Sequence, residues 1–335
     1  MIDVVVTHPQ SKLATYYGAR ATAALQAIAR VRFNPGDTDL DVRGLIDLAR
    51  GADVIVSYRQ TVADEALFAA LPALKAFVRC AIDIRNIDVA AASRHGVLVT
   101  QASAGFIASV SEWIVGVMID WSRGISASAA RYHAGQPVAP TMGRELRGAT
   151  LGVIGYGQIG RHFCEIALAL GMRVVVHDPL NATRNAQLAQ LGFDELLACA
   201  DYVVCLAAAT PATENMMNAT AFATMQRHAM FINASRGELV DDAALIAALD
   251  AGVIAGCAVD VGRAPDQMPS QQVAAHPRVI ATPHIGGLTP PAIEHQALET
   301  VAQITELIHG RVPPGAVNAA QAHRWRAAYA EQVSP

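Results

Sequence analysis

The chain has 335 residues, of which 53% are apolar and 16% are charged. This length and composition predict about two domains with large buried cores and exclude an intrinsically disordered protein. The net charge of −4, without a basic run, gives no reason to expect a nucleic-acid partner. Lys12 and Lys75 are the only lysines, and a Walker A phosphate-binding motif is absent from the sequence.

The five cysteines are scattered through apolar stretches and form neither a CxxC pair nor a Cys/His cluster. We therefore expect free thiols in a reducing compartment and no metal site. The first residues lack the basic region and long apolar run of a signal peptide, and no uncharged apolar run reaches the about 18 residues that a membrane span needs. The sequence thus predicts a soluble cytoplasmic protein without a membrane partner.

Short apolar runs alternate with amphipathic stretches, which predicts parallel sheets with helices on both faces. In chain order, the predicted strands are Ile2–Thr7, Val54–Ser57, Ala76–Arg79, Thr150–Ile154, Arg173–His177, Tyr202–Leu206, Ala229–Asn233, Ala255–Val259 and Val279–Ala281. A long helix is predicted over Ile107–Trp121, with a break near Gly124. Further helices are predicted over Gln158–Leu170 and Pro291–Gly310.

Residues 151–160 read LGVIGYGQIG, in which Gly155, Gly157 and Gly160 fill the GxGxxG spacing between a predicted strand and a predicted helix. The first glycine permits a tight turn, the second the approach of a pyrophosphate and the third the packing of helix on strand. The helix start offers free N–H groups and a positive dipole end to the phosphates. Asp178 ends the next strand, where it would accept from both ribose hydroxyls and repel a 2′-phosphate, which predicts NAD rather than NADP.

These patterns predict an α/β protein with two Rossmann-like, doubly wound domains. Residues 1–100 begin the substrate (catalytic) domain, and residues 286–318 are expected to return to it because the final helix has no strand of its own after it. Residues 101–285 form the expected NAD-binding domain, inserted into the first. Residues 319–335 are expected to form a C-terminal extension with an additional helix.

Several further segments are distinctive in their residues and their order. They are SVSEW (109–113), RELRGATLGVIGYGQIG (144–160), ATPATENMMN (209–218), INASRGELVDDAAL (232–245), AGCAVDV (255–261), TPHIGGLT (282–289) and VPPGAVN (312–318). Together they resemble the D-2-hydroxyacid dehydrogenase family, which includes glyoxylate/hydroxypyruvate reductases and phosphoglycerate dehydrogenases. The resemblance covers about residues 75–318, whereas the first 70 residues are similar only in pattern.

The resemblance implies an NAD-dependent oxidoreductase that acts on the CH–OH group of a small 2-hydroxy acid. It also implies a homodimer formed largely through the long helix region after about residue 105. The implied catalytic residues are Arg236, which would bind substrate, and His284, the acid/base. The expected cofactor-binding residues are Gly155, Gly157, Gln158, Ile159, Gly160, Asp178, Pro179, Thr213, Ala234, Asp260 and Gly286. The expected substrate-binding residues are Ile82, Asp83 and Arg236.

The residue types suit these roles on chemical grounds. A 2-oxo acid presents a carboxylate beside a carbonyl, and the guanidinium of Arg236 offers planar paired donors to both. Hydride transfer to the carbonyl carbon leaves an oxygen that needs a proton, and the imidazole of His284 can supply it near neutral pH.

The expected carboxylate partner of this histidine is missing at its usual place. The family has a glutamate five positions after the aspartate equivalent to Asp260, and here that position is Pro265. Asp266 is the preferred substitute, because its carboxylate would raise the pKa of the imidazole and orient the ring. Two alternatives remain open: Gln267 could pair with the histidine, as an amide does in formate dehydrogenases, or the histidine has no partner.

The substrate loop, RCAIDIRNID (79–88), also departs from the family. Ala81 and Asp83 occupy positions where the family has glycines, and Arg85 replaces an expected aspartate. An acidic side chain beside an anion-binding loop is unfavourable unless Asp83 points away or pairs with Arg85. Alternatively, Asp83 contacts a hydroxyl or amine of an unusual substrate.

Two rival functions follow from these departures. A non-catalytic NAD-sensing protein of the same fold is favoured by the altered loop and the missing glutamate, and is opposed by the retained Arg236 and His284. A formate dehydrogenase-like oxidoreductase is the other alternative.

Overall fold

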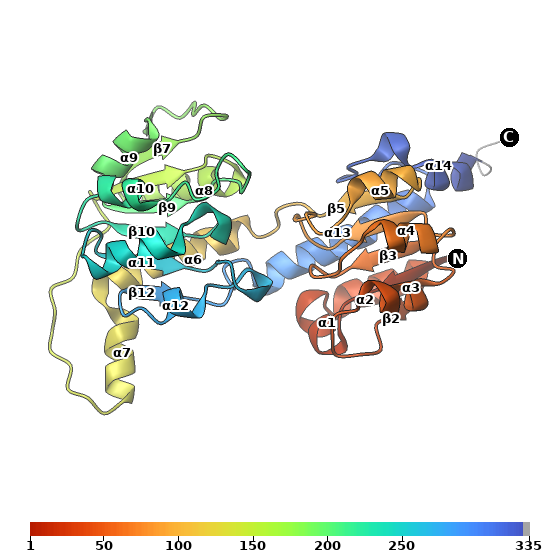
Figure 1. The fold of residues 1–335 in the computed structure, drawn as a ribbon, viewed down its shortest axis with the longest axis horizontal. Helices are drawn as coiled ribbons and strands as arrows, with labels where there is room; N and C mark the ends of the chain where they lie inside the picture. Colours follow the sequence, from red (N-terminus) through yellow and green to blue (C-terminus); the bar gives the residue numbers. More distant parts are fainter. Residues whose placement is uncertain (331–335) are drawn as a thin grey trace. The chain divides into compact units, whose positions relative to one another are not determined.

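The computed structural model describes residues 1–330, and the chain divides into two compact units (Figure 1). Unit 1 combines Met1–Gly105 with the chain from Pro290 onward, and unit 2 comprises Phe106–Thr289. Each unit has its own parallel sheet and its own buried apolar clusters. The α/β fold class predicted from the sequence is therefore confirmed.

The five strands of unit 1 pair in parallel in the order β2-β1-β3-β4-β5. They are β1 (Ile2–Val6), β2 (Ala29–Phe33), β3 (Val54–Ser57), β4 (Ala76–Arg79) and β5 (Leu98–Gln101). The helices of this unit are α1 (Gln10–Tyr16), α2 (Ala19–Ile28), α3 (Val42–Ala49), α4 (Glu65–Ala70), α5 (Val89–Arg94), α13 (Pro290–Ile308) and α14 (His323–Ala330), with a 3-10 turn η3 (Ala319–Gln321).

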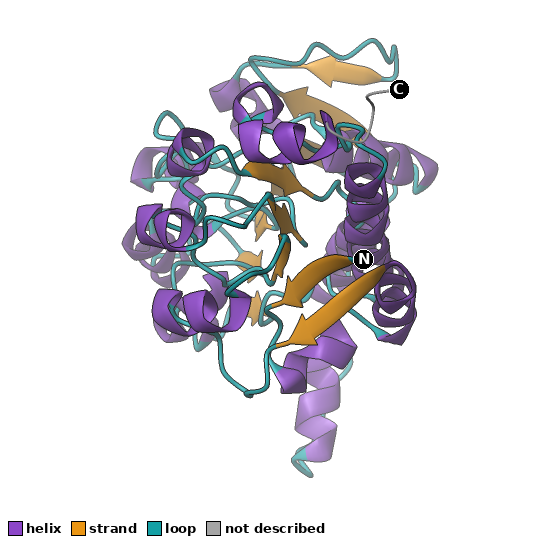
Figure 2. Cartoon of the chain, turned by 90° about the vertical axis from the view of Figure 1, so that its right-hand side faces the viewer, coloured by secondary structure: helices purple, strands orange, loops and turns teal. Residues whose placement is uncertain are grey.

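Helices cover both faces of this sheet because successive strand residues point to opposite sides (Figure 2). Val4 and Val6 pack in one cluster with Leu25 of α2 and Ile304 of α13, whereas Val5 joins the opposite cluster with residues of α3, α4 and α5. The long C-terminal helix α13 packs against α2, so both ends of the chain build this core. Helix α13 thus belongs to unit 1.

The seven strands of unit 2 pair in parallel in the order β12-β11-β10-β9-β6-β7-β8. They are β6 (Thr150–Ile154), β7 (Arg173–His177), β8 (Leu188–Gln190), β9 (Tyr202–Cys205), β10 (Met230–Asn233), β11 (Gly256–Val259) and β12 (Val279–Ala281). The helices are α6 (Ile107–Arg123), α7 (Ile125–His133), α8 (Gln158–Ala169), α9 (Phe193–Cys199), α10 (Ala219–Thr224), α11 (Asp242–Asp250) and α12 (Gln271–Ala274), with 3-10 turns η1 (Gly237–Leu239) and η2 (Pro265–Gln267).

The strand order of unit 2 reverses beside its first strand. From β6 the chain first adds β7 and β8 on one side, and then returns to add β9, β10, β11 and β12 on the other. Helices α6 and α8 cover one face of the sheet and α9, α10 and α11 cover the other. In open parallel sheets of this kind, ligands bind outside the carboxyl ends of the strands at such a reversal point.

All nine strands predicted from the sequence are present, with bounds that differ by at most one residue at either end. Strands β2, β5 and β8 were not predicted, and each lies at an edge of its sheet. An edge strand pairs on one side only and needs less apolar character: β2 reads ARVRF and has one fully buried residue. Strands β2 and β8 therefore lack the continuous apolar run of the central strands, whereas β5 has buried apolar residues and was missed nonetheless.

The long helix α6 ends where the glycine break was expected. Its last residue is Arg123, and Gly124 adopts a left-handed backbone with φ of 63°. Within the predicted C-terminal extension, α14 begins at His323, and residues 331–335 lie outside the described residues. Among the helices of the described chain, none combines the length and apolar character that crossing a bilayer requires.

Ile304→Ala is expected to lower the free energy of unfolding by about 2–5 kcal/mol, because it leaves a cavity between α13 and the sheet of unit 1, where Ile304 is fully buried. Val312→Ala is the control, since Val312 is 52% exposed and its truncation should change stability by less than about 0.5 kcal/mol. Urea unfolding of both variants measures the difference. Equal effects would mean that α13 does not stabilise unit 1.

Candidate functional site

The glycine-rich loop joins β6 to α8 at the reversal point of the unit 2 sheet. Gly155 has φ of 99°, and a Cβ atom there would lie 2.6 Å from the main-chain nitrogen of Ala207. A Cβ atom on Gly160 would lie 2.2 Å from the carbonyl oxygen of Gly155, so the helix approaches the turn closely because this side chain is absent. A Cβ atom on Gly157 would meet nothing within 4 Å, which leaves open space in front of the loop.

Helix α8 starts at Gln158 directly after this loop, and no side chain of the described residues caps it. The first N–H groups of a helix have no partners within the helix and carry the positive end of its dipole. A phosphate group is the ligand that such an uncapped start beside open space accommodates best. Gln158 is exposed and Ile159 is half-buried at this position.

Asp178 follows β7 and fastens the glycine-rich loop to it. One carboxylate oxygen accepts from the main-chain N–H of Tyr156 at 2.7 Å and from the side chain of Asn181 at 3.1 Å. The other oxygen accepts from the main-chain N–H groups of Leu180 and Asn181 at 2.8 and 2.9 Å. Partial burial opposes the charge, but these hydrogen bonds outweigh it and hold the pKa of Asp178 below its usual range.

The other residues expected to contact the cofactor lie on loops at the same edge of the sheet. The hydroxyl of Thr213 donates to the carbonyl oxygen of Ala208 at 2.7 Å and so closes its own loop after β9. Ala234 follows β10 and is half-buried, whereas Pro179 is exposed beside Asp178.

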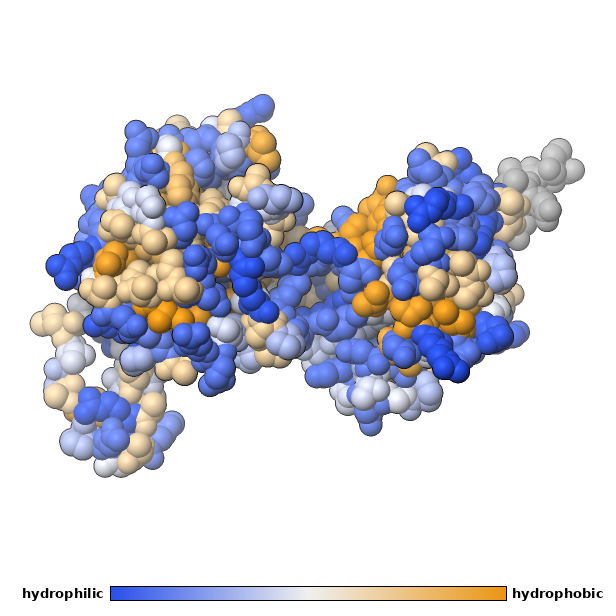
Figure 3. Space-filling model, viewed as in Figure 1, coloured by the Kyte–Doolittle hydropathy of each residue, from blue (hydrophilic) through white to orange (hydrophobic). Residues whose placement is uncertain are grey.

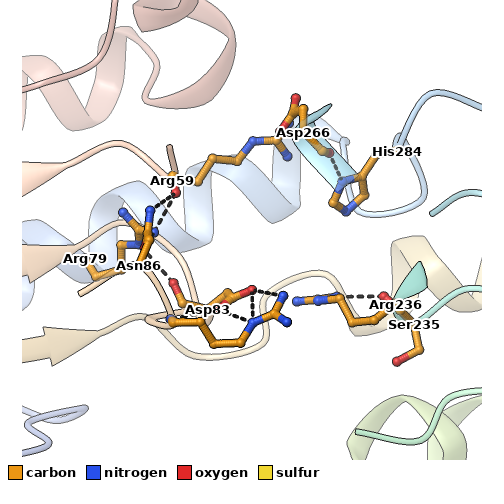
Figure 4. A network of polar contacts seen from close by, with 9 residues as sticks. Arg59, Arg79, Asp83, Asn86, Ser235, Arg236, Asp266 and His284 are labelled. Carbon is orange, nitrogen blue, oxygen red and sulfur yellow. Dashed lines mark hydrogen bonds and ion pairs between the residues drawn. The ribbon is translucent and has the colours of Figure 1, made fainter. Parts of the chain in front are cut away.

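Arg236 lies on a loop that the buried side chain of Asn233 shapes. Asn233 ends β10; its carbonyl oxygen Oδ1 accepts from the N–H of Ser235 at 3.1 Å, and its Nδ2 donates to the carbonyl oxygen of Arg236 at 2.9 Å. The hydroxyl of Ser235 donates to the carbonyl oxygen of Ala207 at 2.6 Å, which ties this loop to the one after β9. The guanidinium of Arg236 donates to the carbonyl oxygen of Ser235 at 2.7 Å (Figure 4).

His284 lies on the loop after β12, which the carboxylate of Asp260 holds. One oxygen of Asp260 accepts from the hydroxyl of Thr282 at 2.6 Å and from the N–H of Ile285 at 2.8 Å. The other accepts from the N–H of Gly286 at 2.7 Å. Asp260 is only 3% exposed, so these bonds satisfy a buried charge and fasten the residues on both sides of His284.

The imidazole of His284 contacts the turn η2. Its Nδ1 lies 3.0 Å from the main-chain carbonyl oxygen of Asp266, as the dashed line in Figure 4 shows. The carboxylate of Asp266 was the partner preferred from the sequence, and the bond at Nδ1 is made by the main-chain oxygen of the same residue. The reason is local: Asp266 has φ of 60° and ψ of 25°, and this left-handed turn presents its carbonyl to the ring.

In unit 1, the loops after β3 and β4 are joined by the guanidinium of Arg79, which is 1% exposed. Its acceptors are the main-chain carbonyl oxygens of Tyr58, Arg59, Thr61 and Asp83 and the side-chain oxygens of Ser57 and Asn86. Figure 4 shows the bonds to Arg59, Asp83 and Asn86. Burial lowers the pKa of Arg79 to about 10, which still leaves it charged near neutral pH. Hydrogen bonds from a buried cation therefore hold the loop that carries the expected substrate-binding residues.

Asp83 pairs with Arg85 within that loop. The two side chains lie 2.8 Å apart, and a carboxylate oxygen of Asp83 also accepts from the main-chain N–H of Arg85 at 3.0 Å. The pairing with Arg85, one of the arrangements considered for Asp83, is confirmed by this contact. Ile82, the neighbouring candidate, is half-buried.

Much of unit 2 is similar to a known protein family. Residues 115–286 match the sequence profile of the D-isomer specific 2-hydroxyacid dehydrogenase, NAD binding domain. The chain belongs to the D-isomer specific 2-hydroxyacid dehydrogenase family. Its NAD-binding domain lies in unit 2 and includes the glycine-rich loop, Asp178, Arg236 and His284.

Several relatives support this assignment. The chain is 32% identical to D-3-phosphoglycerate dehydrogenase 2, chloroplastic, of Arabidopsis thaliana over 81% of this chain and 44% of the plant protein. It is 32% identical to (S)-sulfolactate dehydrogenase of Chromohalobacter salexigens over 85% of this chain and 92% of that protein. D-lactate dehydrogenase from Escherichia coli has the same fold, with a TM-score of 0.82 and 23% identity over 95% of this chain and 100% of that one. The chain spans about half the length of the phosphoglycerate dehydrogenases that it matches.

Sequence reasoning did not single out two residues that organise the loops of this 2-hydroxyacid dehydrogenase family member. Arg79 and Asn233 each end a predicted strand, and each is buried with its polar atoms bonded to neighbouring loops. A polar residue that ends a buried strand was the available signal, because such a residue must find partners at the edge of the sheet.

Asp178→Asn is expected to lower the free energy of unfolding by about 0.5–1 kcal/mol at pH 7, because an amide cannot accept all four hydrogen bonds of the carboxylate. The effect is small because solvent screens this partly exposed group. The folded pKa is depressed, so this stabilisation is present above about pH 4 and is lost as the pH falls below it. Urea unfolding at pH 7 and pH 3 should show the difference shrinking at the lower pH. A difference of equal size at both would contradict the assignment.

Proposed function

We propose that this family member is an NAD-dependent D-2-hydroxyacid dehydrogenase that interconverts a small 2-hydroxy acid and the corresponding 2-oxo acid. One observation carries the proposal: Arg236 follows β10 and His284 follows β12, at the same edge of one parallel sheet as the glycine-rich loop after β6. A guanidinium, an imidazole and a dinucleotide loop at one edge are the groups that hydride transfer to a 2-oxo acid needs.

Arg236 binds the substrate in this proposal. Its planar guanidinium can donate in parallel to the carboxylate and the carbonyl oxygen of a 2-oxo acid, and it keeps its charge at every physiological pH. The bonds from Asn233 to Ser235 and Arg236 hold the main chain on both sides of this residue. A fixed main chain restricts where the guanidinium can reach, which favours one orientation of the substrate.

His284 moves the proton in this proposal. NADH, when bound, supplies the hydride to the carbonyl carbon. A protonated His284 then gives its Nε2 proton to the carbonyl oxygen, and in the reverse direction the neutral ring takes the proton of the hydroxyl. The loop of His284 is held by Asp260, so the ring approaches the substrate from a fixed main chain.

Unit 1 is the proposed substrate domain, with residues 1–100 and 286–318 as its expected extent and unit 2 as the NAD-binding domain. The loop after β4, fastened by Arg79, is the proposed place where unit 1 holds the substrate carboxylate. The charge of Asp83 is offset by Arg85, which lowers the repulsion that an anion would meet there. A cytoplasmic location is proposed because all five cysteines are free thiols, as is usual in a reducing compartment.

A panel of 2-oxo acids tests the proposed function by the oxidation of NADH. Glyoxylate, hydroxypyruvate, pyruvate and phenylpyruvate are tested as substrates, with 3-phosphoglycerate and sulfolactate plus NAD for the oxidation that two relatives are named for. His284→Ala should lower kcat by about 100- to 10,000-fold because the proton donor is lost. Arg236→Lys should raise KM for the acid because paired donors are lost.

His309→Ala is the matched control, since His309 is an exposed histidine of unit 1, and it should keep full activity. Turnover that survives in His284→Ala would contradict the proposed acid/base role. NAD binding without turnover of any 2-oxo acid would favour the NAD-sensing protein, and oxidation of formate by NAD would favour the formate dehydrogenase-like function.

A homodimer is also proposed, on the evidence of an arm formed by residues 125–148. The arm consists of α7 and the segment after it, and it projects from the body of unit 2 (Figure 1). Helix α7 has no buried residue. Ile125, Tyr132 and Met142 are 54%, 66% and 100% exposed, and the arm carries apolar and polar patches on the face in Figure 3. A nine-residue helix is marginal in water alone, so a second copy is the proposed cover.

Tyr132→Asp is expected to shift the protein from dimer to monomer, because it places a charge on the proposed contact surface of the arm. Light scattering after size-exclusion chromatography measures the mass. Leu180→Asp is the control: Leu180 is 90% exposed on unit 2 outside the arm, and its change should leave the mass as in the parent. A parent protein that elutes as a monomer, or a Tyr132→Asp variant that remains dimeric, would rule out this role of the arm.

A further inference from the structure

The contact between His284 and the turn η2 determines which ring nitrogen carries the proton. The distance from Nδ1 to the carbonyl oxygen of Asp266 is 3.0 Å. A carbonyl oxygen only accepts hydrogen bonds, so Nδ1 must be the donor and must carry a hydrogen. In the neutral ring, Nε2 is then the nitrogen with a lone pair, and it is the atom that exchanges a proton.

The main chain on both sides of this bond is in an unusual conformation. Asp266, Gln267 and His284 have φ of 60°, 58° and 56°, and among residues 1–330 the only other non-glycine residue with positive φ is Asn215. Each such residue costs of order 1 kcal/mol and persists only where its surroundings hold it. Three of the four gather at one hydrogen bond, which points to a selected geometry.

The surroundings do hold both partners. On the side of Asp266, the N–H of Gly262 donates to the carbonyl oxygen of Gln267 at 2.8 Å, and the N–H of Ala264 donates to that of Met268 at 3.0 Å. On the side of His284, Asp260 fastens the two residues that follow it. The carbonyl of Asp266 and the main chain that follows His284 are therefore held by separate sets of bonds.

We propose that the main-chain carbonyl of Asp266, and not its carboxylate, is the group that orients His284 for proton transfer, which makes Asp266 a positioning residue. This inference rests on the proposed function for its catalytic meaning. The Nδ1–H bond is present whether or not Nε2 is protonated, so the ring keeps one orientation through a reaction cycle. This bond then requires only that the residue at position 266 can adopt the left-handed backbone conformation.

If the carboxylate were the partner of His284, every substitution that removes its charge should have the same effect. If the main-chain carbonyl is the partner, the effect depends on whether the new residue adopts the left-handed backbone. Asparagine and glycine adopt left-handed backbone readily, whereas a β-branched valine does not. Under the proposal, Asp266→Asn and Asp266→Gly keep the carbonyl in place although both remove the charge. Asp266→Val removes the same charge and also displaces the carbonyl.

The first test reads the tautomer of His284 by ¹⁵N NMR on the full chain with NAD and without substrate. The parent, Asp266→Asn and Asp266→Gly should all show the hydrogen on Nδ1, and Asp266→Val should show a mixture or the other tautomer. This readout does not depend on turnover. A change of tautomer in Asp266→Asn would overturn the proposal, because it would assign the anchor to the side chain.

The second test measures kcat and KM on the best 2-oxo acid of the panel. Asp266→Asn and Asp266→Gly should stay within about threefold of the parent in kcat, and Asp266→Val should lose about tenfold or more with KM for NADH unchanged. Equal losses in all three variants would overturn the proposal. If the parent turns over no 2-oxo acid while the tautomers behave as expected, the proposed function fails and the positioning contact stands.

Discussion

Parallel pairing of the unit 2 strands is the constraint on which the site depends. All seven strands run the same way, so their carboxyl ends lie at one edge of the sheet. The glycine-rich loop, Arg236 and His284 come from separate parts of the chain, and each directly follows a strand. The sheet therefore brings a phosphate-binding loop, a cation and an acid/base group to one edge, although they lie far apart in the sequence.

Buried polar side chains at that edge hold the loops in place. Asn233 and Asp260 follow or end adjacent strands of unit 2, and Arg79 ends a strand of unit 1; each bonds main-chain groups of the loops that follow. A buried polar group without partners costs a few kcal/mol. A loop that moved away from one of these side chains would break its hydrogen bonds and incur that cost, so the bonds restrict the loop to one conformation. These buried side chains thus hold the loops that carry the proposed chemistry. In the proposed mechanism they do not themselves contact a reacting group.

The central strands, the long helices and the dinucleotide motif could be predicted because their signals are local. A continuous apolar run identifies a buried strand, and the GxGxxG spacing requires only the residues between β6 and α8. Edge strands such as β2 and β8 escaped prediction because pairing on one side relaxes the demand for apolar residues. Arg79 escaped because its importance lies in acceptors from two loops, which composition does not reveal.

The sequence by itself determined the fold class, the family resemblance and the positions of Arg236 and His284, because each depends on residue type and short-range spacing. Only the tertiary structure decided which atom meets the ring of His284. The candidates were side chains of Asp266 and Gln267, and the contact came from a main-chain oxygen eighteen positions away in the sequence. A main-chain carbonyl is common to every residue, so residue type does not predict this contact, and the direction of the carbonyl depends on the φ and ψ that the turn adopts in the folded chain.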